Sequence, residues 1–156
     1  MSATGTIRID RPFDEVAELL SARPADWLVP FLRIATHAGE AAAGRSLRLT
    51  SPPGSRQLTV ELLPAVPGDD RDELVVPLRW RTGGFHWVPP SYAGRIVVRR
   101  VSGRACEMLI EGSYALPPTV VDLSEAEAAS LATEATMATF LRSFRVAVEE
   151  QARQTG

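Results

Sequence analysis

Alternating hydrophobic and polar residues fill the middle of the chain. Between residues 47 and 116, short runs with every second residue apolar are separated by segments rich in Gly, Pro, Asp and Ser. Such period-two alternation is typical of strands with one dry face and one wetter face. It predicts an antiparallel sheet whose dry face carries Leu58, Val60, Leu62, Leu74, Val76, Leu78, Trp80, Cys106, Met108, Ile110 and Tyr114. Residues 93–101 remain unassigned, because Val and Arg occur at both alternating positions.

A short strand and a first helix are predicted ahead of the sheet. Ile7 and Ile9 alternate with polar residues, and Asp10 and Pro12 then provide a candidate cap and a first turn. The helix that follows has one apolar stripe at helical spacing, formed by Phe13, Val16, Ala17 and Leu20.

A second helix is predicted to start at Pro24. Pro30 lacks a backbone N–H and is expected to break the helical hydrogen-bond ladder. Trp27 and Phe31 are therefore expected on a short, kinked segment, and His37 in a loop after it.

The C-terminal region changes to helical periodicity. Ser124 and Glu127 form a capping box, and good helix formers continue to Arg153, which predicts a helix about 42 Å long. Its apolar stripe consists of Ala126, Ser130, Thr133, Met137, Phe140, Leu141, Phe144 and Val148. Bulky residues in the second half of the stripe fill space against a sheet, whereas small residues in the first half can leave space open.

Taken together, these elements predict an α+β helix-grip fold in a single domain spanning residues 1–156. A curved antiparallel sheet of about seven strands would wrap around the long C-terminal helix, with two short helices after the first strand. The segment TIRIDRPFDEVAELLSARPADWL and the helix Ser124–Arg153 resemble the START-like (SRPBCC) superfamily, which includes the birch pollen allergen and the polyketide cyclases.

Two internal segments add to this resemblance. PLRWRTGGFHWVPPSYAGRIVV and LIEGSYALPP are similar to an uncharacterised bacterial subgroup of the superfamily, from which no catalytic residue can be carried over. The resemblance implies a deep cavity between the sheet and the long helix, with a hydrophobic or amphipathic small molecule as the ligand.

Composition narrows the range of partners. Apolar residues make up 45% of the 156 residues and the net charge is −2, which is ordinary for a soluble globular protein and gives no reason to expect nucleic acid. The basic cluster at residues 95–104 is followed by Glu107 and Glu111, so a solvated sheet face is the simpler interpretation. Neither a signal peptide nor a membrane span is visible, and a cytoplasmic location is expected. The sequence is compatible with either a monomer or a homodimer.

Metal and cofactor sites are not predicted. Cys106 is the only cysteine, which excludes an internal disulfide and a cysteine-based zinc site. His37 and His86 are too far apart in the sequence to suggest a metal site. We therefore expect no cofactor and no metal.

The predicted dry face carries no Asp, Glu, Lys, Arg or His, so no catalytic residue is assigned and binding is favoured over catalysis. His86 has no carboxylate partner nearby in the sequence, and Cys106 fits a small core residue. The candidate ligand-binding residues are Trp27, Phe31, Trp80, His86, Trp87, Met108, Ile110, Tyr114, Thr133, Met137, Phe140, Leu141 and Phe144.

Two other functions remain open. A polyketide cyclase or aromatase would use Tyr114, His86 and Arg81, although Arg81 falls on the wet face by alternation and Tyr114 could simply bond the backbone. An adaptor of the chaperone-activator type would instead need an exposed apolar patch on the wet face, where Val75, Val97 and Leu109 could align.

Overall fold

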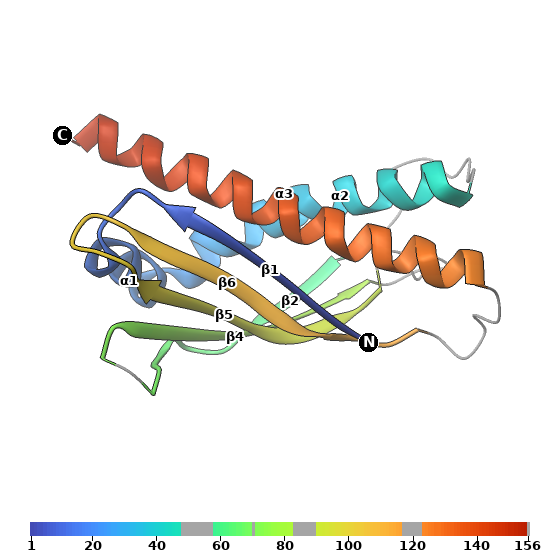
Figure 1. The fold of residues 1–156 in the computed structure, drawn as a ribbon, viewed down its shortest axis with the longest axis horizontal. Coiled ribbons are helices and arrows are strands. Elements are labelled where there is room, and N and C mark those ends of the chain that lie inside the picture. The colour runs from blue at the N-terminus through green and yellow to red at the C-terminus, as the bar shows by residue number, and fades with distance from the viewer. Residues whose placement is uncertain (48–57, 70, 83–89, 117–122, 156) are drawn as a thin grey trace.

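A computed structural model describes residues 1–47, 58–69, 71–82, 90–116 and 123–155 (Figure 1). One layer is a curved antiparallel sheet, and the two long helices lie together along one side of it (Figure 1). The elements in chain order are β1 (Ser2–Ile9), α1 (Phe13–Ala22), α2 (Pro24–Leu47), β2 (Leu58–Leu62), β3 (Val66–Pro67), β4 (Glu73–Thr82), β5 (Tyr92–Arg100), β6 (Cys106–Tyr114) and α3 (Leu123–Thr155).

The sheet has six described strands in the order β1-β6-β5-β4-β2, and β3 also pairs with β4. Both β2 and β3 lie along the same edge of β4, because β5 occupies its other edge. Between the pairs Leu62↔Leu78 and Val66↔Val75, three residues on one side face two on the other, which makes a β-bulge. The sheet is open, with β1 at one edge and β2 and β3 at the other.

The strand register decides the faces of residues 93–101. Tyr92 pairs with Tyr114, and Ile96 pairs with Ile110, so the even-numbered residues of β5 share the inner face with those of β6. Val97 therefore lies on the outer face. Alternation alone could not decide this, because Val residues occupy both faces of β5.

Helix α1 confirms the predicted stripe, since Phe13, Val16 and Leu20 are buried. The prediction that Asp10 caps this helix was wrong. Pro12 occupies the cap position with φ of −57° and no side chain caps the helix. The backbone N–H of Asp10 instead donates to Glu149 Oε1 at 3.0 Å, which ties the turn to α3.

Helix α2 is longer than predicted. Pro30 lies inside it, and the helix continues to Leu47, so His37 is helical rather than in a loop. Pro30 is exposed, and proline removes only one N–H from the ladder. Packing along α3 therefore holds the helix together past this residue.

Helix α3 spans 33 residues, about 50 Å. Its small residues pack against α2: a Cβ on Gly39 would lie 2.1 Å from Thr136 Oγ1 and 2.7 Å from the Ala132 carbonyl oxygen. The side of the first half that faces α2 is thus closed, and it is a different side from the predicted stripe, which contains Ser130 and Thr133. No described helix is long and apolar enough to cross a membrane.

Candidate ligand-binding layer

The space between the sheet and the helices is bounded by uncharged side chains. Arg100, at the far end of β5, is the one charged residue that the register places on the inner face of the described strands. The other residues that the register places on this face include Ala3, Gly5, Ile7, Ile9, Val60, Leu62, Leu74, Val76, Leu78, Trp80, Tyr92, Gly94, Ile96, Val98, Cys106, Met108, Ile110, Gly112 and Tyr114.

One end of this layer is filled by aromatic rings, and we call it the phenylalanine end (Phe13, Trp27, Phe31, Phe140 and Phe144). The Phe144 ring meets Trp27 and Phe31 edge-on at centroid distances of 6.4 Å, and Phe140 at 6.3 Å. Phe140 and Phe144 are fully buried. Phe13, which belongs to this end, is the first residue of α1.

The opposite end, which we call the tyrosine end, comprises Trp80, Tyr92, Tyr114, Ser130 and Thr133. Trp80 and Tyr92 stack with centroids 4.4 Å apart and planes inclined by 15°. The Trp80 indole N–H donates to the Pro90 carbonyl at 3.1 Å, and the Tyr92 hydroxyl donates to the Ala3 carbonyl at 3.1 Å. Both polar groups are therefore used within the protein.

Tyr114 differs from Tyr92, although the two residues pair directly across β5 and β6. Tyr114 is 5% exposed and belongs to the buried core. Its backbone N–H bonds the Met1 carbonyl at 2.8 Å, but its hydroxyl makes no hydrogen bond to any described residue. A buried hydroxyl without a partner costs about 1–3 kcal/mol.

The small half of α3 contributes hydroxyl groups that are already bonded. Thr133 Oγ1 donates to the Ala129 carbonyl at 2.8 Å, and Thr136 Oγ1 donates to the Ala132 carbonyl at 2.7 Å. Each threonine consequently offers its methyl group and spare lone pairs rather than a free donor.

The layer reaches solvent along the β2 edge. Val60 and Leu62 pair with the buried residues Trp80 and Leu78 but are themselves half-buried. On α2, Trp27 and Phe31 are also half-buried, although both contact Phe144. Large apolar side chains are thus partly accessible on the two elements that border this edge.

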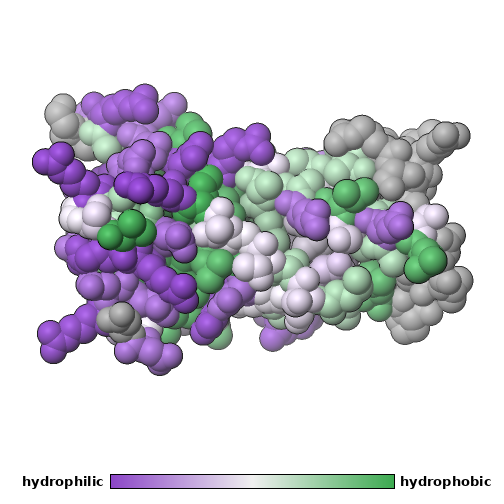
Figure 2. Space-filling model, in the orientation of Figure 1, coloured by the Kyte–Doolittle hydropathy of each residue, from purple (hydrophilic) through white to green (hydrophobic). Residues whose placement is uncertain are grey.

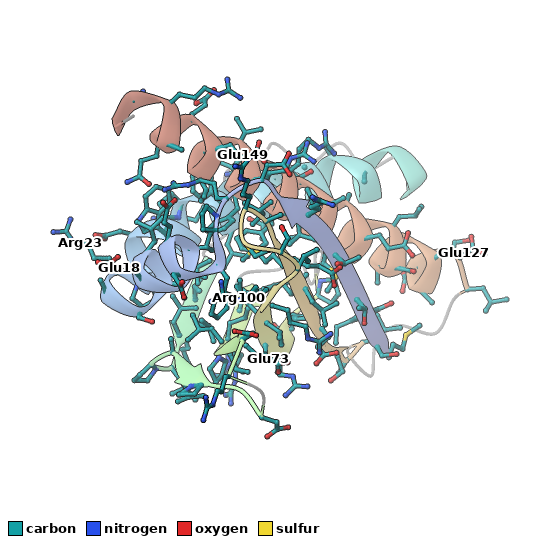
Figure 3. The ribbon with its side chains drawn as sticks, turned by 60° about the vertical axis from the view of Figure 1, so that its left-hand side comes forward. Glu18, Arg23, Glu73, Arg100, Glu127 and Glu149 are labelled. Carbon is teal, nitrogen blue, oxygen red and sulfur yellow. The ribbon has the colours of Figure 1, made fainter. Side chains whose placement is uncertain are left out.

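Charged networks close the phenylalanine end. Arg100 bonds Asp72 at 2.9 Å and Asp14 at 3.0 Å, and its guanidinium carbon lies 5.1 Å from the Phe13 ring centroid. Figure 3 shows Arg100 at the end of the sheet nearest α1. Arg11 is buried and donates to the Val148 carbonyl at 2.9 Å and to Glu15.

The surface seen in Figure 2 also differs between the two ends of the molecule. In Figure 2, the half around α1 and the C-terminal part of α3 is mostly hydrophilic, whereas the half at the start of α3 is pale and green. Leu123 and Leu131, both on the first part of α3, are 83% and 46% exposed.

The outer face of the sheet carries the predicted charges. Arg95 pairs with Glu111 at 2.6 Å and Arg99 with Glu73 at 3.1 Å, as expected for a solvated face. Arg81 is exposed on this face as well. An open groove of about 630 Å³ crosses the face, lined by Ser2, Thr4, Val75, Pro77, Gly94, Arg95, Glu111 and Gly112.

The row proposed for an adaptor surface does align across three strands, because Val75 pairs with Val97 and Val97 with Leu109. However, Val97 is fully buried and the other two are half-buried. The row therefore exposes little apolar area.

Cys106 lies on the inner face near α1, opposite Ile9, and is fully buried. Burial raises the pKa of its thiol to about 11, although nearby Arg11 acts in the opposite direction. At neutral pH the thiol is protonated and poorly nucleophilic. No group of three or more His, Cys, Asp and Glu residues in the described part of the chain is placed to hold a metal ion.

The predicted ligand-binding residues fall into three groups. Phe140 and Phe144, with Trp27 and Phe31, form the phenylalanine end, and Trp80, Tyr114 and Thr133 belong to the tyrosine end. The middle of the layer is buried core made of Met108, Ile110, Met137 and Leu141.

His86 and Trp87 lie outside the described residues. The sequence interpretation missed Tyr92, which it left out of the inner face. The alternation Tyr92, Gly94, Ile96 and Val98 was the available signal, but Val97 obscured it.

Comparison with known proteins supports the fold. A protein from Thermus thermophilus matches with a TM-score of 0.53 at 12% identity, covering 97% of this chain and 99% of the other. A START superfamily protein from Mycobacterium smegmatis matches with a TM-score of 0.50 at 9% identity, covering 96% and 98%.

An aromatase/cyclase from Streptomyces sp. R1128 matches with a TM-score of 0.49 at 14% identity, covering 100% of this chain and 98% of the other. Neither the scan with family models nor the search of curated proteins found a match. The chain has a START-like fold, and identities this low do not assign an activity.

Proposed function

We propose that the protein binds a hydrophobic or amphipathic small molecule between the sheet and α3, at the tyrosine end. The observation that carries this proposal is the hydroxyl of Tyr114, a buried inner-face residue, which has no described hydrogen-bond partner. The one charged residue on the inner face of the described strands, Arg100, lies at the opposite end. Binding sites for small molecules are typically apolar with a few placed polar groups. The START-like fold, with a long helix against a curved sheet, is compatible with such a site.

The half-buried residues of β2 suggest how a ligand would enter. Val60 and Leu62 border the layer and remain partly accessible, so an apolar molecule could contact them on its way to Tyr114. A ligand that covers such exposed apolar surface removes it from water, which stabilises the complex.

A ligand screen tests the proposal. Native mass spectrometry and thermal shift against fatty acids, polyketides, isoprenoids and flavonoids should give at least one 1:1 complex with a raised melting temperature. Val60→Arg places a charge at the border and should weaken binding by about tenfold or more. Thr59→Arg, one residue away on the outer face, is the control and should not. Equal effects of both variants, or no complex at all, would contradict the proposal.

A cyclase or aromatase reaction is the second candidate, supported by the burial of Tyr114 on the inner face. Arg81 lies on the outer face, so such a reaction would depend on Tyr114 and on His86. The mass of a bound polyketide after incubation separates the two candidates. Loss of water supports the reaction, whereas an unchanged mass together with an unchanged chromatographic retention time supports binding alone, because cyclisation without dehydration conserves the mass.

A further inference from the structure

Besides the open groove, the outer face of the sheet has a smaller hollow, at the end where β4 finishes and β5 begins. Its volume is about 350 Å³, and the residues that line it include Arg79, Arg81, Ala93 and Ser113. The register places these four side chains on the outer face, because Arg79 pairs with Ala93 and Ala93 with Ser113, and Arg81 follows two residues after Arg79 on β4. A ligand bound there would be independent of one between the sheet and α3, which covers the other face.

Small side chains leave this hollow open. In the row that crosses β4, β5 and β6, the long side chain of Arg79 is followed by Ala93 and then by Ser113. Directly opposed side chains in a sheet are close enough to contact one another when they are large. A methyl group and a hydroxymethyl group do not fill the space, so Arg79 and Arg81 lie beside a floor of small residues.

Farther along the outer face, each arginine of β5 has a close carboxylate partner. Arg95 contacts Glu111 at 2.6 Å, and the two residues pair directly across β5 and β6. Arg99 contacts Glu73 at 3.1 Å, and these two pair across β5 and β4. The positive charge of both arginines is therefore balanced within the sheet.

The two arginines at the hollow lack close partners of this kind. Arg79 reaches Glu61 only at 3.9 Å, and both side chains are about half exposed, so the pair contributes little. Arg81 lies opposite Thr59 and makes no ion pair with any described carboxylate. None of the described residues that line the hollow is acidic. The hollow therefore carries an excess of positive charge.

This charge and its geometry indicate the kind of group that would bind. A guanidinium group donates in a planar fork that matches the oxygens of a carboxylate or a phosphate. Two such groups side by side match a phosphate monoester, which carries about −1.5 to −2 charges near pH 7, better than a carboxylate with a single charge. The exposed Ser113 hydroxyl supplies a further donor. Met1, whose ammonium group donates to the Tyr114 carbonyl at 3.0 Å, also lines the hollow.

We propose that this hollow binds the phosphate group of a small phosphate monoester, with Arg79 and Arg81 donating to its oxygens. Its volume is at the lower end of the range for small-molecule sites, and is larger than a phosphate group alone requires. Ala93 and Ala115 add apolar lining for the organic part of the ester. The assigned ligand class is thus a small phosphate ester rather than inorganic phosphate or a carboxylate.

A titration with phenyl phosphate, followed by ¹H–¹⁵N NMR at pH 7.5 and physiological ionic strength, tests the site and the ligand class. The amide signals of Ala93 and Ser113 should shift and reach saturation. Phenyl phosphate should bind about fivefold or more tightly than inorganic phosphate, and than phenyl sulfate and phenylacetate, which carry one negative charge. Equal affinity for any of these three would overturn the assigned class, and the absence of a saturating shift would overturn the site.

Arg81→Gln tests the assigned contact. It should weaken phenyl phosphate binding by about tenfold, because it removes a charge and a bidentate donor, and it should leave the melting temperature unchanged because Arg81 is exposed. Arg99→Gln is the matched control, since it removes one positive charge from the same face outside the hollow, and its affinity should stay within about twofold of the native protein. Equal losses in the two variants, or no loss in Arg81→Gln, would overturn the assignment.

Discussion

The phenylalanine end and the tyrosine end lie under the same helix and against the same sheet, yet they are built differently. At the phenylalanine end, three aromatic rings contact Phe144, and two arginine networks lie at the border. At the tyrosine end, α3 carries small and hydroxylated residues, and the large side chains come from the sheet. The first end is filled by packed aromatic rings, and the second keeps one buried tyrosine whose hydroxyl has no described hydrogen-bond partner.

The largest expected effect comes from emptying the phenylalanine end. Phe144→Ala should destabilise the protein by about 3–5 kcal/mol, because the three surrounding rings cannot collapse into the space. Urea unfolding followed by circular dichroism measures the loss. Val146→Ala, at a site that is 44% exposed on the same helix, should change the free energy of unfolding by less than about 0.5 kcal/mol. Similar values for the two variants would show that the end is not packed as described.

Gly39→Ala tests the contact between α2 and α3 beside the tyrosine end. Within an exposed helix this substitution usually stabilises by about 1 kcal/mol. Here the added Cβ would meet Thr136 Oγ1 and the Ala132 carbonyl, so we expect a loss of about 1–3 kcal/mol in chemical denaturation. A gain in stability would mean that the helices do not approach so closely.

The two tyrosines should separate stability from binding. Tyr92→Phe removes the bond to the Ala3 carbonyl and should cost about 1 kcal/mol of unfolding free energy. Tyr114→Phe removes a buried hydroxyl that has no described partner and should be neutral or slightly stabilising. Thermal unfolding of both variants without ligand checks this, and the reverse order would contradict the division of roles.

A smaller effect is expected from Cys106 at alkaline pH. Because burial raises the pKa of its thiol from 9.0 to about 11, the unfolded chain loses the proton first as pH rises. The contribution to stability is present below pH 9 and is lost through pH 11. Between pH 9 and 10 the native protein should lose roughly 1 kcal/mol more than Cys106→Ala. Parallel stability profiles for the two proteins would show that the thiol is not buried.

The periodicity of the sequence was sufficient for the main architecture. The alternation at 74–80 and 106–114 and the helical stripe from Met137 to Val148 predicted buried residues correctly. Burial of one face of a strand or helix requires apolar residues at a regular spacing, and this spacing can be read from a short stretch of sequence.

Features that depend on tertiary packing could not be predicted from the sequence pattern. Pro30 suggested a break, but contacts with α3 sustain α2 past it. The close approach at Gly39 and the different partners of Tyr92 and Tyr114 depend on which residues meet across elements. No pattern in the sequence shows that the Tyr92 hydroxyl bonds a backbone carbonyl and that the Tyr114 hydroxyl has no described partner.

Methionine-methyl NMR tests most directly whether the tyrosine end is where a ligand binds. Met137 lies one turn after Thr133, and side chains on a helix lean towards its N-terminus. Met108 lies six residues along β6 from Tyr114, about 20 Å away. With ¹³C-methyl methionine and the tightest ligand from the screen, assigned through Met137→Leu and Met108→Leu, we expect the Met137 signal to shift more than the Met108 signal on titration. The reason is that Met137 packs beside Gly5, which pairs with Ile110, between Met108 and Tyr114 on β6. A shift of Met108 without Met137, or no shift of either at saturating ligand, would contradict the account.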